Sequence, residues 1–191
     1  MTLPTLGTLN WQRAVDHPEL LAVPTRLALD RWVASDASAA DQVAVAAIDP
    51  GLADTIALTE AYALPLAASA NCVLVGGRRE GHERVAAAVV RATTRADVNN
   101  TVKRLLDVRK ASFLPTDRAV EESGMEFGGI TPLGLPTGYR ILVDLRATRS
   151  DPVAGSAVLL GSGLRRSKIL IPAELLATMP GVEVVDGLAL A

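Results

Sequence analysis

The segment "MEFGGITPLGLP", residues 125–136, has a composition suited to holding a ligand with its backbone. Gly128 and Gly129 precede Thr131 and Pro132, and Glu126 is its only charged residue. Two adjacent glycines let the main chain turn sharply and approach a ligand closely, because no Cβ intervenes. Free N–H groups in such a bend can bind an anion or the oxyanion of an acyl transfer. The alternative is a tight turn that only shapes the fold.

A second glycine bend, Gly161-Ser162-Gly163, offers the same backbone chemistry. The commoner catalytic patterns are missing. His17 and His82 do not stand at metal-ligand spacing from the single Cys72, so we expect no metal site. The sequence has no phosphate-binding GxxxxGK[ST] pattern, and no nucleophile-elbow pattern marks a serine. Cys72 lies in an apolar run and is expected to be a core residue.

Composition predicts one globular domain that can bury a core, since 49% of the 191 residues are hydrophobic and 21% are charged. One cysteine excludes an internal disulfide and suits a reducing compartment. No run approaches the length of a membrane span and no signal peptide is recognisable, so we expect a cytoplasmic protein without membrane contact. Residues 78–118 carry ten basic and five acidic side chains in a chain of net charge −2. This basic middle is either a solvated face or a surface for phosphates.

The pattern of apolar residues predicts alternating helices and strands, several of them linked as hairpins. Strands are expected at 42–49, 140–146 and 182–186, a short strand at 109–114, and hairpins at 71–92 and 156–172. Helices are expected at 54–64, 95–108, 116–124 and 172–181, with one or two more at 17–33 broken by Pro24 and a loop at 34–41. The hairpins favour a mixed sheet surrounded by helices over a doubly wound parallel sheet.

The order of these pieces resembles the YbaK/ProX family of aminoacyl-tRNA editing domains. "GGITPLGLP" after "ESGME" is similar to the family's GGxSPxG signature, and "LLGSGLRRSKILIPAELL" (159–176) resembles its SxGxRxxKIxLxPxDL hairpin and helix. "TEAYALPLAASANCVLV" (59–75) and "ADVNNTVKRLLDVRKASF" (96–113) resemble a helix leading into a strand and a helix before a short strand. The match spans roughly residues 42–186. Residues 1–41 lie outside it and are expected to form a helical extension packed on an editing-like domain of residues 42–191.

The resemblance implies a mixed α/β domain whose twisted, mostly antiparallel sheet is partly barrel-like. It implies hydrolysis of the ester that joins a wrong amino acid to the 3′ end of a tRNA, without a cofactor. Backbone amides of Gly128 and Gly129 would hold the ester carbonyl or a water. Substrate-binding positions would include Ile130, Thr131, Pro132, Gly161, Ser162 and Gly163, and the acceptor stem would meet basic residues such as Arg109, Lys110, Arg165 and Arg166. A synthetase is a further candidate partner, and the chain is expected to be a monomer or a dimer.

One departure from the family concerns the start of the strand after the first helix, where a lysine important for deacylation is usual. The aligned residue here is Asn71, which can hydrogen-bond a hydroxyl or a water but carries no charge. Lys110 or Arg109 is a candidate replacement from another strand. The leading hypothesis is therefore a trans-acting aminoacyl-tRNA deacylase. The alternatives are a binding module that has lost turnover and an unrelated small-molecule hydrolase that uses the same pocket.

Overall fold

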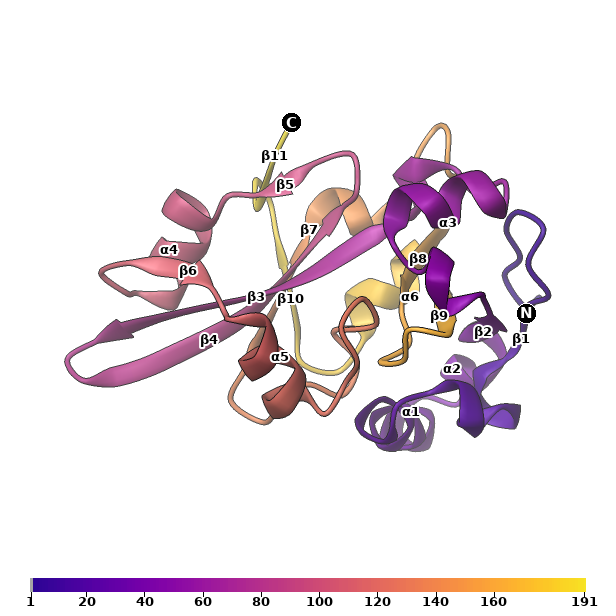
Figure 1. Cartoon of the computed structure of the whole chain (residues 1–191), viewed down its shortest axis with the longest axis horizontal. Helices are drawn as coiled ribbons and strands as arrows, with labels where there is room; N and C mark the ends of the chain where they lie inside the picture. The colour runs from indigo at the N-terminus through magenta and orange to yellow at the C-terminus, as the bar shows by residue number, and fades with distance from the viewer. Residues whose placement is uncertain (1) are drawn as a thin grey trace.

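The computed structural model describes residues 2–191 and contains a long five-stranded sheet beside a four-stranded one (Figure 1). The five-stranded sheet has the order β10-β7-β4-β3-β6. Its strands are β3 (Ala70–Arg79), β4 (His82–Arg91), β6 (Ala111–Phe113), β7 (Arg140–Asp144) and β10 (Val182–Val185). β7 pairs in parallel with β4 and with β10, whereas β3 pairs antiparallel with β4 and β6. β3 and β4 form a long hairpin arm that projects from the body of the molecule (Figure 1).

The second sheet is antiparallel throughout and has the order β1-β2-β9-β8. It contains β1 (Gln12–Arg13), β2 (Ala44–Ala47), β8 (Ala157–Gly161) and β9 (Ser167–Pro172). A single bridge between Ser69 and Leu159 links β8 to the start of β3, so the two sheets meet there. A two-stranded ribbon pairs β5 (Arg95–Ala96) with β11 (Ala189–Leu190). The predicted mixed α/β class is confirmed, and the strands of the described residues do not close into a barrel.

Helices cover the sheets and supply the rest of the core. They are α1 (Val23–Ser35), α2 (Ser38–Gln42), α3 (Thr55–Ala61), α4 (Lys103–Leu106), α5 (Thr116–Ser123) and α6 (Ala173–Thr178). Gly124 ends α5 with a φ of +64°, as its sequence position predicts, because glycine adopts this conformation without a Cβ penalty. Among residues 2–191, none of the helices has both the length and the apolarity that a bilayer crossing requires.

Two sequence-based assignments were wrong. Residues 34–41 contain α2 where we predicted a loop. The single helix predicted over 95–108 is replaced by β5, a π-helix at Val98–Val102 and the short α4. The reason is tertiary: β5 pairs with β11 from the C-terminal end of the chain, which the local periodicity does not reveal. Asp97 caps the π-helix by accepting hydrogen bonds from the backbone N–H groups of Asn100 and Thr101.

The segment before residue 42 packs into the same core as the sheets. Trp32 and Leu29 of α1 are buried in the cluster that holds Val45 of β2 and Ile169 of β9. Gln12 and Arg13 form an edge strand on β2, and Trp11 is buried beside Ala46. These residues share their clusters with strands β2 and β9, so the segment contributes directly to the hydrophobic core. A domain boundary at residue 41 stays a prediction.

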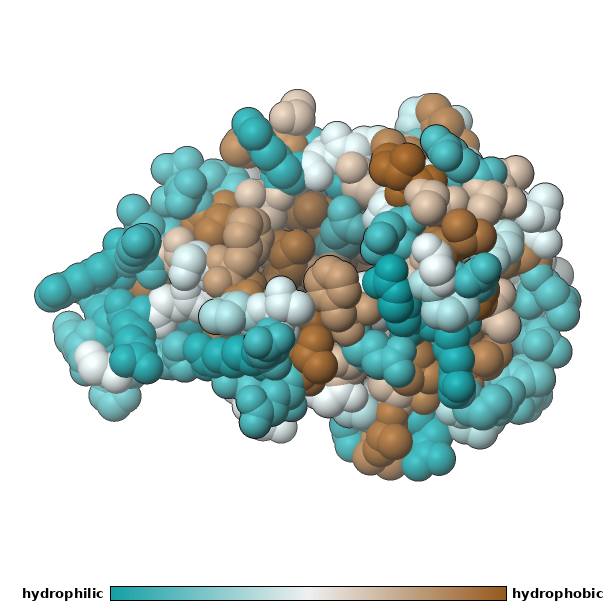
Figure 2. Space-filling view, in the orientation of Figure 1, coloured by the Kyte–Doolittle hydropathy of each residue, from teal (hydrophilic) through white to brown (hydrophobic). Residues whose placement is uncertain are grey.

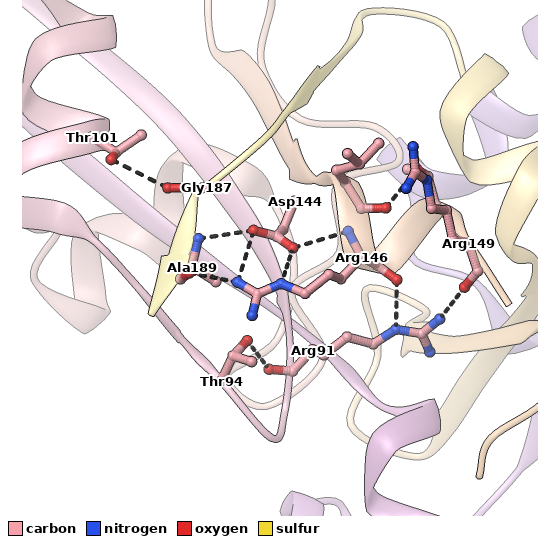
Figure 3. Close-up of polar contacts among 10 residues, drawn as sticks. Arg91, Thr94, Thr101, Asp144, Arg146, Arg149, Gly187 and Ala189 are labelled. Carbon is pink, nitrogen blue, oxygen red and sulfur yellow. Dashed lines mark hydrogen bonds and ion pairs between the residues drawn. The ribbon is translucent and has the colours of Figure 1, made fainter. Parts of the chain in front are cut away.

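Arg91, at the end of β4, fixes the junction between the sheets. Its side chain is buried and donates hydrogen bonds to the carbonyl oxygens of Arg149 at 3.0 Å and Arg146 at 3.4 Å (Figure 3). It also donates to the carbonyl oxygen of Ala67 at 2.8 Å. Burial lowers the pKa of this guanidinium, and Asp151 raises it in part. The turn at Leu66–Ala68, which leads into β3, is therefore held to the segments after β7.

We expect Arg91→Met to lower the free energy of unfolding by about 2 kcal/mol, because buried carbonyl oxygens lose their donors. Urea denaturation followed by circular dichroism measures the change. Arg149→Met, at an exposed side chain in the same region, is the control and should change stability by less than about 0.5 kcal/mol. Equal effects of the two substitutions would contradict the role assigned to Arg91.

Candidate functional site

The glycine loop, the start of β3 and the β8–β9 hairpin enclose a cavity of about 350 Å³, which we call the first cavity. Gly128 and Ile130 border it from the loop, Asn71 from β3, Gly161 from β8 and Lys168 from β9. Residues separated by up to 97 positions in the sequence thus meet at one place. The structure therefore brings both predicted glycine bends and the position of the family lysine together.

Lys168 is the cavity residue that the sequence reasoning missed. Only 7% of its surface is exposed, and Nζ donates hydrogen bonds to the carbonyl oxygens of Ala53 at 3.0 Å and Gly128 at 3.3 Å. Burial lowers the pKa of its ammonium group to about 8, with a further decrease from Arg165 and a partial increase from Asp54. Two signals were available: the lysine of the family's SxGxRxxKIxLxPxDL motif aligns with Lys168, and Lys168 lies within the apolar strand "SKILIP", where a charge is costly unless it has a use.

The glycine loop is held by the second glycine bend. The Gly129 N–H donates to the Glu126 carbonyl at 2.9 Å, and the Gly163 N–H donates to the Gly129 carbonyl at 2.7 Å. Glu126 N–H donates to the Gly163 carbonyl at 2.8 Å. Within residues 2–191 the N–H groups of Gly128 and Ile130 have no such partner. Of the two predicted glycines, Gly128 is therefore the one whose amide is free to meet a ligand.

Gly128 also needs to be a glycine because of its backbone conformation. Its φ of +79° is one that residues with a Cβ rarely adopt. A Cβ would also lie 2.5 Å from Arg165 Nη1, the end of a flexible side chain that can move aside. Arg165 reaches across the loop to donate to the Pro50 carbonyl at 2.9 Å, and its guanidinium lies 5.9 Å from the centre of the Phe127 ring. Phe127 lines the first cavity, and Arg165 contacts it from outside the lining.

Asn71 borders the first cavity from the start of β3. Its Oδ1 accepts a hydrogen bond from Thr55 Oγ1 at 3.3 Å, which leaves the side-chain N–H₂ without a partner among the described residues. Thr55 is the first residue of α3, so the helix predicted before this strand also positions the side chain. An amide donor at the border of a cavity can bind a ribose hydroxyl or a water.

The other predicted site residues lie outside the first cavity. Thr131 is fully buried and its N–H contacts Met125 Sδ at 3.4 Å. Ser162 is fully buried, and its Oγ shares a hydrogen bond of 2.8 Å with Ser167 Oγ. Pro132 borders a separate hollow near α1, and Gly163 has a φ of +84° in the second bend. These residues shape the two bends, and their part in substrate binding stays a prediction.

The four basic residues that we predicted as tRNA contacts fall into two groups. Arg165 does not line the first cavity but contacts two residues that do, Asp54 and Phe127, while Arg166 donates to the Glu19 carbonyl at 2.7 Å. Arg109 and Lys110 precede β6 on the arm and do not border the first cavity. Lys168, rather than Lys110 or Arg109, is the cation that the fold brings to the site.

Thiolate chemistry does not fit the first cavity. Cys72 borders it, but burial raises the pKa of the thiol to about 12, so the group stays protonated at neutral pH. Among residues 2–191, no three His, Cys, Asp or Glu side chains cluster in a way that would hold a metal ion. The groups available at the cavity are therefore a backbone N–H, an ammonium group, an amide, the Asp54 carboxylate and the hydroxyls of Thr55 and Ser69.

Comparison with known proteins identifies the fold and the family of this chain. A search of curated proteins found no significant match. Among solved structures, the hypothetical protein APE2540 superposes with a TM-score of 0.67 at 17% identity, covering 83% of this chain and 97% of that one. A candidate trans-editing enzyme for prolyl-tRNA synthetase gives a TM-score of 0.65 at 16% identity, covering 87% of this chain and 97% of that one. At these identities the likeness establishes the fold.

The sequence model described as "Aminoacyl-tRNA editing domain" matches residues 49–168. This range begins before α3 and ends at Lys168, so it contains the glycine loop, Asn71, β8 and the first two residues of β9. It covers well over half of the chain. The protein therefore belongs to the aminoacyl-tRNA editing domain family.

Proposed function

We propose that this protein is a trans-acting aminoacyl-tRNA deacylase that hydrolyses the ester of a mischarged tRNA in the first cavity. The observation that carries the proposal is Lys168: its buried ammonium group lies beside the glycine loop, in a chain that lacks the lysine usual at position 71. An ammonium group held in a low-dielectric cavity costs free energy to bury, so a role in stabilising negative charge accounts for its presence.

The proposed chemistry uses three groups at the first cavity: the Gly128 N–H, the Lys168 ammonium group and the Asn71 amide. The ester carbonyl oxygen accepts a hydrogen bond from the Gly128 N–H, and the Lys168 ammonium stabilises the negative charge that develops when water attacks the carbonyl carbon. Asn71 donates to the ribose hydroxyl next to the ester. The bond between the acyl carbon and the ribose oxygen then breaks. The ribose oxygen takes one proton of the attacking water, and the amino acid leaves as a carboxylate after the other proton passes to solvent. Lys168 thus supplies the charge that Asn71 cannot.

The arm supplies a surface for the acceptor stem. Lys103, Arg104, Arg109 and Lys110 lie on α4 and beside β6, and none of them forms an ion pair within residues 2–191. Arg79 and Arg84, by contrast, are paired with Asp107. β3 runs from Asn71 at the cavity to Arg79 near the tip of the arm, roughly 26 Å at 3.3 Å per residue. Phosphates of a stem whose end enters the cavity would meet these side chains.

The alternative function is a module that binds aminoacyl-tRNA without turnover, which the uncharged Asn71 favours. Release of amino acid from a panel of mischarged tRNAs, small amino acids first, distinguishes the two when wild type and Asn71→Lys are compared. We expect hydrolysis by the wild type, because Lys168 already provides the ammonium group. Activity only in Asn71→Lys would indicate a binding module, and no release by either protein would exclude a deacylase.

A further inference from the structure

The two phenylalanines of this chain are both on the surface. The sequence contains only two, Phe113 and Phe127, and each of these residues is 61% exposed. Phenylalanine is among the residues most often buried, and a protein so poor in aromatic residues would gain stability by burying both. Phe127 forms the rim of the first cavity, and Phe113 forms the wall of another that adjoins it. Two exposed rings at neighbouring cavities indicate ligands with flat surfaces.

The adjoining cavity, which we call the second cavity, has a volume of about 540 Å³. Its walls are Val73, Val90, Phe113 and Leu190, and its polar edge is made by the segment from Thr94 to Asn100. It shares Asn71 and Val73 with the first cavity. Figure 2 shows apolar side chains gathered in the middle of the face, over β3 and beside β5, with the hydrophilic tip of the arm beyond them.

The second cavity is built from tightly held elements. Asp97 accepts four hydrogen bonds from Asn100 and Thr101, which fixes the π-helix along the polar edge. At the far side, buried Asp144 accepts from the Ala189 N–H at 2.8 Å and pairs with Arg146 at 2.9 Å, so β11 stays against β5 (Figure 3). Leu190 and Arg95 are neighbours in that ribbon. A preformed cavity of this kind loses little entropy when a ligand enters.

We propose that the second cavity binds the terminal nucleobase of the tRNA, stacked on Phe113, while its aminoacyl ester occupies the first cavity. This inference rests on the proposed function. In the 3′-terminal nucleoside of a charged tRNA, the base and the ester project from the same ribose in different directions. Two cavities that share Asn71 match this layout, with the ribose at Asn71 itself.

The polar edge is suited to an adenine. The Asn99 side chain has no hydrogen bond within the described residues, and the Asn100 amide uses a donor on Asp97 at 3.0 Å, which leaves its oxygen as an acceptor. A carboxamide presents a donor and an acceptor side by side, the pattern that pairs with the edge of adenine. Arg95 is exposed and forms no ion pair among residues 2–191, so it can meet the phosphate that precedes the terminal nucleoside.

The test uses an RNA hairpin that ends in single-stranded CCA, with 2-aminopurine replacing the terminal adenine. Stacking on an aromatic ring quenches 2-aminopurine fluorescence, so a titration reports where the base lies. We expect quenching by the wild type, and for Phe113→Ala a loss of quenching with about a tenfold weaker Kd, since stacking of one base on an aromatic side chain contributes about 1–3 kcal/mol. Because Phe113 is exposed, its replacement should leave the fold intact.

Val153→Ala, at an apolar side chain that is 76% exposed in a loop away from both cavities, is the control and should bind as the wild type does. Arg95→Gln should reduce the slope of log Kd against log salt concentration by about one. Unchanged quenching in Phe113→Ala would overturn the inference, as would AMP binding as tightly as the hairpin, because the site would then serve a free nucleotide.

Because the RNA hairpin carries no amino acid, its binding tests this inference separately from the proposed catalysis. Quenching that depends on Phe113 supports the base site even if no ester is hydrolysed. Hydrolysis of mischarged tRNA with the same KM in wild type and Phe113→Ala would establish the deacylase and overturn the base site.

Discussion

Lys168→Met is expected to lower kcat/KM for deacylation by about 100-fold, the effect of removing one preorganised group that stabilises an oxyanion. The same change should not destabilise the protein. The Ala53 and Gly128 carbonyl oxygens lose their donor, which costs about 2 kcal/mol. This loss is offset because the lowering of the Lys168 pKa from 10.5 to about 8 corresponds to a cost of about 3 kcal/mol for burying the charge. Methionine fills a similar volume without that cost. Loss of activity together with retained stability distinguishes a catalytic lysine from a structural one.

The pH dependence provides a second readout of Lys168. The pKa of Lys168 in the folded protein lies below its pKa in the unfolded chain. The free-energy cost of burying its charge is therefore fully present below pH 8 and disappears as the pH rises toward 10.5. The unfolding free energy of the wild type relative to Lys168→Met should therefore rise over this window. Enzymatic deacylation, after subtraction of spontaneous hydrolysis, should fall above about pH 8 as the ammonium loses its proton. Arg31→Met, at an exposed residue of α1, should alter neither measurement.

Gly161→Ala is expected to destabilise the protein by about 3 kcal/mol and to impair deacylation. A Cβ at this position would lie 2.2 Å from the Gly129 carbonyl oxygen and 2.7 Å from that of Ile130, so backbone must move against backbone. Gly161 also pairs with Lys168 in the β8–β9 ladder. The substitution therefore displaces the glycine loop relative to the ammonium group, and both stability and activity decrease.

Thermal unfolding measures the first effect: about 3 kcal/mol corresponds to a fall in Tm of roughly 6–12 °C for a chain of this size. Gly51→Ala is the matched control, because a Cβ there meets only the Asp49 side chain at 3.2 Å, and its Tm should change by less than about 3 °C. A Gly161→Ala protein as stable and active as the wild type would show that the loop does not need its close contact with β8.

The sequence was sufficient to predict the strands and the glycine loop, because their signals are local. The strand over 42–49, both hairpins and the Gly124 helix end are all present in the structure. The family motif marked the loop and the β8–β9 hairpin, and the structure shows why they go together: Gly129 and Gly163 are hydrogen-bonded to each other. Asn71 was identified by its alignment with the family lysine and does border the first cavity.

What the sequence did not reveal depends on tertiary contacts. Lys168 occurs in an apolar strand, and only the approach of Ala53 and Gly128 from two other segments makes its head group part of a cavity. The second cavity requires β11 to pair with β5 across more than ninety residues, and the same pairing converted the expected helix over 95–108 into a strand and a π-helix. Local periodicity carries no information about such pairings.

The most direct test of the central claim is the release of a radiolabelled amino acid from a mischarged tRNA by the wild-type protein, in single turnover at pH 7 with enzyme in excess. The account predicts first-order release well above the spontaneous rate for at least one small amino acid, and release near the spontaneous rate with Lys168→Met. Release by the wild type no faster than spontaneous hydrolysis across the whole panel would contradict it.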